Sequence, residues 1–216
     1  MKHRFLLFVC VCLLANYSKG QNTIHIATDN VSLLYRIANN GRLYQIYLGQ
    51  KLNDSADFAY LSNLGEAYIS NGLEDYFDPA IRVLHNDGNP SLLLKYVSHE
   101  TKQIQPDVTE TTVFLQDDKY PFDVKLFFIT YAKEDIIKTY TEIVHREKKP
   151  VTLYDYASSM LHLSAANYYL TEFAGDWAKE VDMTETPLAF GKKIIDSKLG
   201  SRANMFSSPF FLLSLN

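Results

Sequence analysis

Cysteine is almost absent from this chain of 216 residues. Its two cysteines, Cys10 and Cys12, both lie within the first 20 positions. Those positions combine a basic start, Met1–Arg4, with an apolar run of 11 residues, Phe5–Ala15. The pattern predicts a secretory signal peptide over residues 1–20, since the apolar run is too short to span a membrane as a helix. A mature chain without cysteine excludes a disulfide framework and a cysteine nucleophile.

Clusters of basic residues are also scarce. Removal of the predicted signal peptide, with Lys2, Arg4 and Lys19, leaves 18 basic against 25 acidic residues and a net charge near −7. An acidic surface of this kind argues against nucleic acid and anionic membranes as partners. An exported protein without disulfides must be held together by its core alone, which favours a bacterial protein in the periplasm or secreted.

The sequence lacks the common catalytic motifs. It contains no phosphate-binding glycine loop, no HExxH and no GxSxG. The histidines beyond residue 20 have no spacing typical of metal ligands; they are His25, His85, His99, His145 and His162. We therefore predict no catalytic residue, no metal site and no cofactor.

What the sequence does contain is a succession of short strand-like segments rich in aromatic residues, with 15 Tyr and 13 Phe. Between positions 109 and 172 they are separated by Asp, Lys and Pro clusters, which is typical of an antiparallel β-ladder. The expected strands there are Thr111–Gln116, Phe122–Tyr131, Ile136–Val144, Val151–Leu163 and Asn167–Phe173. Since Phe127, Ile129 and Tyr131 make the second face of one strand apolar too, we predict a β-sandwich.

Further strands are expected on either side of this ladder. They are Thr23–Ala27, Val31–Ile37, Arg42–Leu48, a hairpin of Ile81–Leu84 with Leu92–Ser98, and Leu188–Ile195 interrupted by Gly191. The single tryptophan, Trp177, follows the strand that ends at Phe173, and we expect it to pack in the sandwich rather than to contact a sugar.

One long irregular stretch, residues 49–89, interrupts the strands. Such loops are uncommon in compact domains and are often functional. Its rings and carboxylates suit contact with a sugar, but composition alone favours an ordered loop whose rings only close the edge of the sandwich. The residues concerned are Phe58, Tyr60, Glu66, Tyr68, Asn71, Glu74, Asp75, Tyr76, Phe77 and Asp78. Glycoside hydrolysis needs two carboxylates about 5 to 9.5 Å apart, and a sequence does not show this spacing.

Four stretches, in order, resemble the N-terminal domain of glycoside hydrolase family 36, the α-galactosidases. They are Glu66–Tyr68 with Gly72–Ala80, Gly88 with Leu94–His99, Phe173–Glu180, and Gly191 with Ser207–Phe210. The resemblance implies an all-β fold over residues 21–216, a mostly antiparallel β-supersandwich of the galactose-mutarotase-like type. In the family this domain precedes a (β/α)8 barrel that carries the catalytic residues of a retaining mechanism. No part of that barrel is in this chain, so the resemblance implies a truncated, non-catalytic accessory domain.

The resemblance also implies partners and a site. The expected partners are the catalytic barrel, further copies of the enzyme in a homo-oligomer, and an α-galactoside bound weakly through the loop. Asp75 is expected to contact a galactose hydroxyl and Tyr76 to wall the pocket. The chain departs from the family pattern at Phe77, where arginine is usual, so the linkage cleaved is left open. The alternative function is a free-standing periplasmic carbohydrate-binding module.

Overall fold

The computed structural model describes residues 22–72, 78–196 and 205–215. The predicted signal peptide, residues 1–20, lies outside the described residues. The chain forms two compact units, Met1–His162 and Leu163–Asn216. Neither unit has, in its described part, a helix long and apolar enough to cross a membrane.

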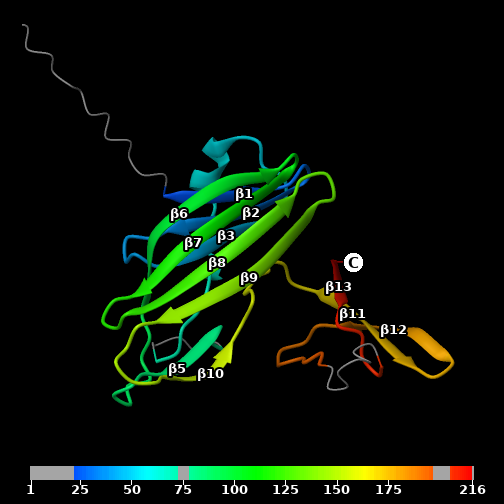
Figure 1. Cartoon of the computed structure of the whole chain (residues 1–216). Helices are drawn as coiled ribbons and strands as arrows, with labels where there is room; N and C mark the ends of the chain where they lie inside the picture. Colours follow the sequence, from blue (N-terminus) through cyan, green and yellow to red (C-terminus); the bar gives the residue numbers. More distant parts are fainter. Residues whose placement is uncertain (1–21, 73–77, 197–204, 216) are drawn as a thin grey trace, which may run out of the picture. The chain divides into compact units, whose positions relative to one another are not determined.

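Strands dominate both units (Figure 1). Unit 1 contains β1 Thr23–Ala27, β2 Val31–Ile37, β3 Leu43–Gln50, the 3-10 helix η1 Ser55–Tyr60, β4 Gly65–Glu66, β5 Ile81–Leu84, β6 Leu94–Gln105, β7 Val108–Asp117, β8 Phe122–Tyr131, β9 Ile136–His145 and β10 Thr152–Tyr156. Unit 2 contains β11 Tyr168–Asp176, β12 Lys179–Pro187 and β13 Phe211–Leu215.

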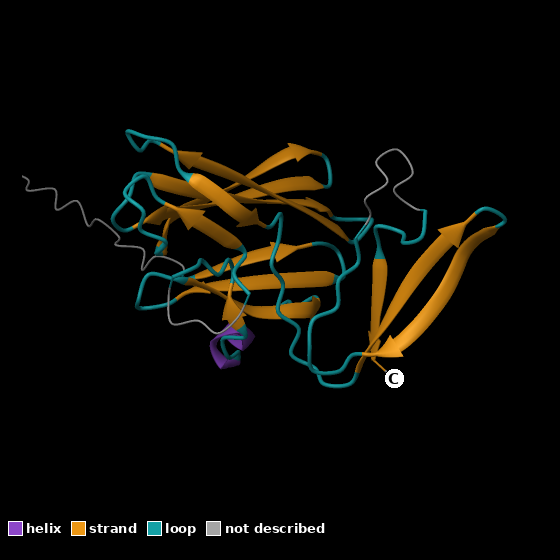
Figure 2. Ribbon diagram, turned by 90° about the horizontal axis from the view of Figure 1, so that it is seen from below, coloured by secondary structure: helices purple, strands orange, loops and turns teal. Residues whose placement is uncertain are grey.

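Unit 1 is a sandwich of two antiparallel four-stranded sheets, which Figure 2 shows as two layers. The first sheet has the order β1-β2-β3-β4 and the second the order β6-β7-β8-β9. Along β8, buried and half-buried side chains alternate from Phe122 to Tyr131, because successive side chains of a strand point to opposite faces. This confirms the predicted all-β, mostly antiparallel sandwich.

The core of unit 1 lies between the inner faces of the two sheets. The rings of Tyr35 and Phe128 meet there with centroids 5.4 Å apart. Burial of each such side chain contributes about 1.5–3 kcal/mol relative to leaving it exposed. Other core residues are Ile24, Ile26, Leu33 and Leu43 from the first sheet, and Val113, Leu115, Phe122, Val124 and Leu126 from the second.

The outer faces of the two sheets differ. Over the first sheet, the Arg36 guanidinium donates to the carbonyls of Phe58, at 2.6 Å, and Leu61, at 2.8 Å, so the segment with η1 is fixed against it. On the second sheet the outward side chains Phe127, Ile129 and Tyr131 are only half-buried. Among the described residues, this outer face of β8 is therefore only partly covered.

Strand pairing corrects two further predictions. The hairpin of Ile81–Leu84 with Leu92–Ser98 is wrong, because β5 pairs with β10 and β6 pairs with β7. The predicted strand Val151–Leu163 is shorter than expected and ends at Tyr156. The wrong hairpin arises because a short strand takes its partner from the tertiary fold and not from its neighbour in sequence.

Unit 2 is a three-stranded antiparallel sheet with the order β12-β11-β13. The strand predicted at Leu188–Ile195 is wrong, since these residues form no strand, and Lys179–Pro187 supplies β12 instead. Gly191 sits in this irregular segment with a φ of +141°, a conformation that favours glycine. The β11–β12 turn uses Ala178 at a φ of +59°.

Candidate functional site

The site residues expected from the sequence, Asp75 and Tyr76, lie outside the described residues, in the segment 73–77. Their contact with a sugar therefore stays a prediction. The structure does describe the residues on both sides of that segment, and these define how the loop is held.

The residues just before the segment belong to the core. Glu66 is 7% exposed and forms an ion pair with Arg42. Tyr68 is 2% exposed and donates its hydroxyl to the Ala157 carbonyl at 2.8 Å, and burial raises the pKa of Tyr68. The predicted contact with a sugar is therefore wrong for Glu66 and Tyr68. Both side chains are buried and stabilise unit 1.

Asn71 and Gly72 fix the start of the segment. The Asn71 side chain accepts from the Val83 N–H at 3.0 Å and donates to the Pro90 carbonyl. Gly72 has a φ of +81°, and a Cβ there would lie 2.6 Å from the Ser91 Cα. Only glycine fits without a shift of the backbone.

The residues that follow segment 73–77 lie beside those that precede it. The Ala80 N–H donates to the Ile69 carbonyl at 2.7 Å, and Ile81 forms a parallel bridge with Ser70. The described residues on both sides of segment 73–77 are thus held by hydrogen bonds at one edge of unit 1. The long stretch 49–89 therefore contains regular structure, namely η1, β4 and β5.

A buried cluster stabilises the turn next to this edge. His85 Nδ1 and Glu147 Oε1 are 2.7 Å apart, and their side chains are 0% and 1% exposed. Glu147 also accepts from the Asn86 N–H at 3.0 Å, and the ring of Tyr120 stacks on His85 at 3.6 Å and 7°. His85 Nε2 lies 3.2 Å from the Ser91 carbonyl oxygen, so the cluster supports the turn on which Gly72 rests.

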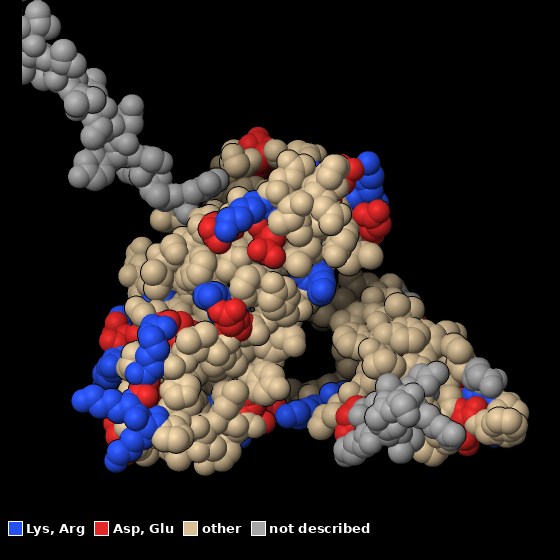
Figure 3. All heavy atoms as spheres, viewed as in Figure 1, with Lys and Arg blue, Asp and Glu red and all other residues tan. Residues whose placement is uncertain are grey.

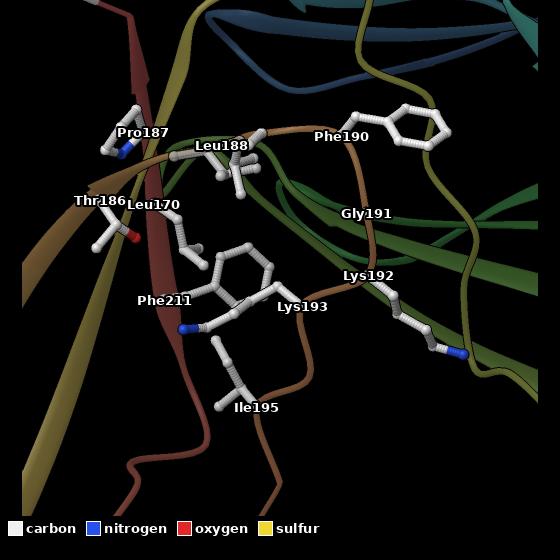
Figure 4. A pocket seen from close by; sticks show the side chains of 12 residues that line it. Leu170, Thr186, Pro187, Leu188, Phe190, Gly191, Lys192, Lys193, Ile195 and Phe211 are labelled. Carbon is white, nitrogen blue, oxygen red and sulfur yellow. The ribbon is translucent and has the colours of Figure 1, made fainter.

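Unit 2 contains a cavity of about 630 Å³. Its walls are mostly apolar, and Figure 4 shows Leu170, Leu188 and Phe211 facing one space. The Lys193 ammonium near this space pairs with Glu172 at 2.7 Å. Such walls suit apolar side chains better than a hydroxylated sugar.

Trp177 is at the β11–β12 turn and is 92% exposed. The expectation that it packs within the sandwich is therefore wrong in the described structure. Its backbone N–H donates to Asp176 Oδ1 at 2.7 Å, which fixes the turn and leaves the indole in solvent.

Among residues 22–72, 78–196 and 205–215, no group of three His, Cys, Asp or Glu side chains could hold a metal ion. Sequence reasoning missed the His85–Glu147 pair, whose members are 62 residues apart in the chain. The only signal was a histidine at the start of an Asn-Asp-Gly-Asn-Pro turn, and it did not indicate a partner.

Comparison with known proteins identifies the family. The family model for the glycosyl hydrolase family 36 N-terminal domain matches residues 41–215. Alpha-galactosidase C of Emericella nidulans is 23% identical over 155 residues, which are 66% of this chain and 20% of that protein.

Solved structures share the fold. The family 36 α-galactosidase AgaB of Geobacillus stearothermophilus has a TM-score of 0.80 at 20% identity, covering 93% of this chain and 32% of AgaB. A variant of α-galactosidase AgaA from the same organism, in complex with raffinose, has a TM-score of 0.80 at 18% identity, covering 90% of this chain and 32% of AgaA. The α-galactosidase of Lactobacillus brevis has a TM-score of 0.75 at 22% identity, covering 89% of this chain and 30% of that one. This chain thus spans a fifth to a third of the length of these relatives.

Proposed function

The chain belongs to the glycosyl hydrolase family 36 N-terminal domain family, and on this premise we propose that it is a non-catalytic accessory domain of an α-galactosidase-type retaining glycoside hydrolase. Its role is to support a catalytic (β/α)8 barrel and to lend a loop to the galactoside pocket. The proposal is supported by the share of each relative that the chain spans, which is 20% of the fungal enzyme and 32% of AgaB.

The observation that carries the proposal is the apolar surface of unit 2. A small three-stranded sheet does not enclose a core of its own, and exposed apolar patches of this kind mark interaction sites. The exposed large apolar residues in the described part of unit 2 are Leu163, Trp177, Val181, Met183, Leu188, Phe190, Ile194, Phe206, Phe210, Phe211, Leu212 and Leu215. We assign this surface, named here the docking surface, to contact with the catalytic barrel.

The loop of segment 73–77 is the second part of the proposal. Asp75 accepts a hydrogen bond from a hydroxyl of the galactoside, and Tyr76 forms a wall of the pocket. The assembly that contains this pocket includes the barrel and further copies of the enzyme. The support is the resemblance together with the anchoring of Asn71, Gly72 and Ala80, because a loop held at both ends places its side chains at low entropic cost.

Export to the periplasm or beyond is the third part. Its support is the apolar run Phe5–Ala15 after a basic start. Mass spectrometry of the chain recovered from the periplasm of a bacterial host should find Gln21 as the first residue. Recovery of the uncleaved chain from the cytoplasm would contradict this part alone.

The accessory role is tested with a chromogenic α-galactoside and the purified barrel of a family 36 α-galactosidase. The chain alone should release no product, and it should raise the activity or the thermal stability of the barrel. Phe211→Ser should abolish that effect, because it places a hydroxyl in the docking surface. Ile136→Ser, a matched change at a residue 52% exposed in unit 1, should preserve it. Turnover by the chain alone would contradict the proposal.

A further inference from the structure

The outer face of the second sheet carries aromatic side chains that remain open to solvent. Strand pairing places Phe114 beside Lys125 and Phe127 beside Tyr140 on this face. The rings of Phe127 and Tyr140 stack at 4.3 Å and 5°, and the Lys125 ammonium lies 5.8 Å from the centre of the Phe114 ring. Figure 3 shows the molecule from the side on which β6–β9 lie: much of the surface is uncharged, and Lys and Arg atoms sit next to Asp and Glu atoms.

A bulge in β6 forms a hollow on this face. The register of β6 against β7 shifts between Tyr96 and Ser98, so Val97 is an extra residue, and its side chain is 57% exposed. Bulges redirect side chains and are frequent beside binding sites. The hollow has a volume of about 160 Å³ and is lined by Val97, Phe114, Leu115, Gln116, Asp123 and Lys125. This is less than the roughly 300–1,000 Å³ of a pocket for a drug-sized ligand, and it suits one small ring.

The charges around the hollow are already balanced. Asp123 accepts from Gln116 Nε2 at 2.9 Å and pairs with Arg146. Lys125 pairs with Glu142 across the neighbouring strands. An ionic ligand would have to disrupt these pairs, whereas a neutral ligand with hydroxyl groups can bind beside them.

We propose that this hollow binds one ring of a neutral oligosaccharide. Phe114 and Val97 offer the apolar surface that the C–H face of a sugar needs, and Gln116 and Lys125 offer an acceptor and donors for its hydroxyls. The choice of carbohydrate as the ligand class rests on the proposed function. A single ring in an open hollow binds with a dissociation constant of about 1 mM.

The test is an NMR titration of the full chain with raffinose. The resonances of Val97, Phe114 and Gln116 should shift together on binding. Gln116→Ala removes an exposed amide together with its hydrogen bond to Asp123, and Phe114→Leu keeps an apolar residue but loses the ring. Each should weaken raffinose binding about tenfold. The control Lys102→Ala, on an outward side chain of β6 that is 60% exposed, should leave the affinity unchanged.

Three outcomes would overturn the inference. They are no shift at a raffinose concentration about ten times the expected dissociation constant, wild-type affinity for raffinose in both hollow variants, or shifts in the hollow caused by the catalytic barrel in place of raffinose. The last would make this face a protein interface. Failure here is distinguishable from failure of the accessory role, because Phe114→Leu should leave the effect of the chain on the barrel intact.

Discussion

Replacement of Glu147 tests the physical account of unit 1 most sharply. In the folded chain its carboxylate lies 2.7 Å from His85 Nδ1 and accepts from Asn86, and neither side chain of the His85–Glu147 pair is more than 1% exposed. Glu147→Ala leaves His85 buried without this partner. Loss of one member of a buried pair costs about 3–5 kcal/mol, and Asn86 recovers part of its bonding from water because it is exposed.

We therefore expect Glu147→Ala to lower the free energy of unfolding by about 3 kcal/mol at pH 7. That is a large part of the roughly 5–15 kcal/mol that stabilises a typical domain. The assay is urea denaturation followed by far-UV circular dichroism, with the m-value checked for constancy. The control is Glu100→Ala, which breaks an exposed pair with Lys102 and should cost less than about 1 kcal/mol.

The pH dependence gives a second reading of the same pair. Burial by itself raises the pKa of Glu147, but hydrogen bonds from His85 and Asn86 outweigh it, and the pKa lies below its usual range. A carboxyl with a lowered pKa stabilises the fold above its unfolded pKa, near 4.3, and this contribution is lost as the pH falls through the folded pKa. The difference between the wild type and Glu147→Gln should therefore shrink below about pH 4. Two results would refute the reasoning. One is a loss of less than about 1 kcal/mol in the free energy of unfolding of Glu147→Ala at pH 7. The other is a difference between the wild type and Glu147→Gln that stays constant down to about pH 3.

Three further changes probe other parts of the molecule. Phe128→Ala removes a core ring that meets Tyr35 and should cost about 3–5 kcal/mol in urea denaturation. Gly72→Ala should cost about 1–3 kcal/mol because of its φ of +81° and the 2.6 Å approach to Ser91; an unchanged midpoint would show that the turn adapts. Asp75→Ala should raise KM for an α-galactoside about tenfold in the complex with the barrel, through loss of a hydrogen bond to a charged group, with the stability of the chain unchanged. An unchanged KM would remove Asp75 from the pocket.

The sheets could be predicted from sequence where local patterns determine them. Phe122–Tyr131 alternates because one face of the strand is buried, and the turns around it contain Asp, Lys and Pro, so its bounds in the structure are those predicted. β1 is predictable for the same reason, since its burial alternates as well. Local alternation is a property of the strand itself and is therefore visible in the sequence.

Long-range partners could not be predicted. β5 pairs with β10, and His85 reaches Glu147 over 62 residues, and neither choice leaves a mark in the local pattern. Tyr68 looked like a loop residue because glycine, serine and asparagine surround it, yet it is part of the core. Trp177 looked like a packing residue because it follows a strand, but the turn exposes it.

The accessory role can be tested most directly through Trp177, because it is the only tryptophan of the chain and lies within the docking surface. Its fluorescence should report an indole in water when the chain is alone, with full access to acrylamide. Titration with the catalytic barrel of a family 36 α-galactosidase should shift the emission to shorter wavelength and protect the indole from the quencher. Emission and quenching that stay unchanged at saturating barrel would contradict the account.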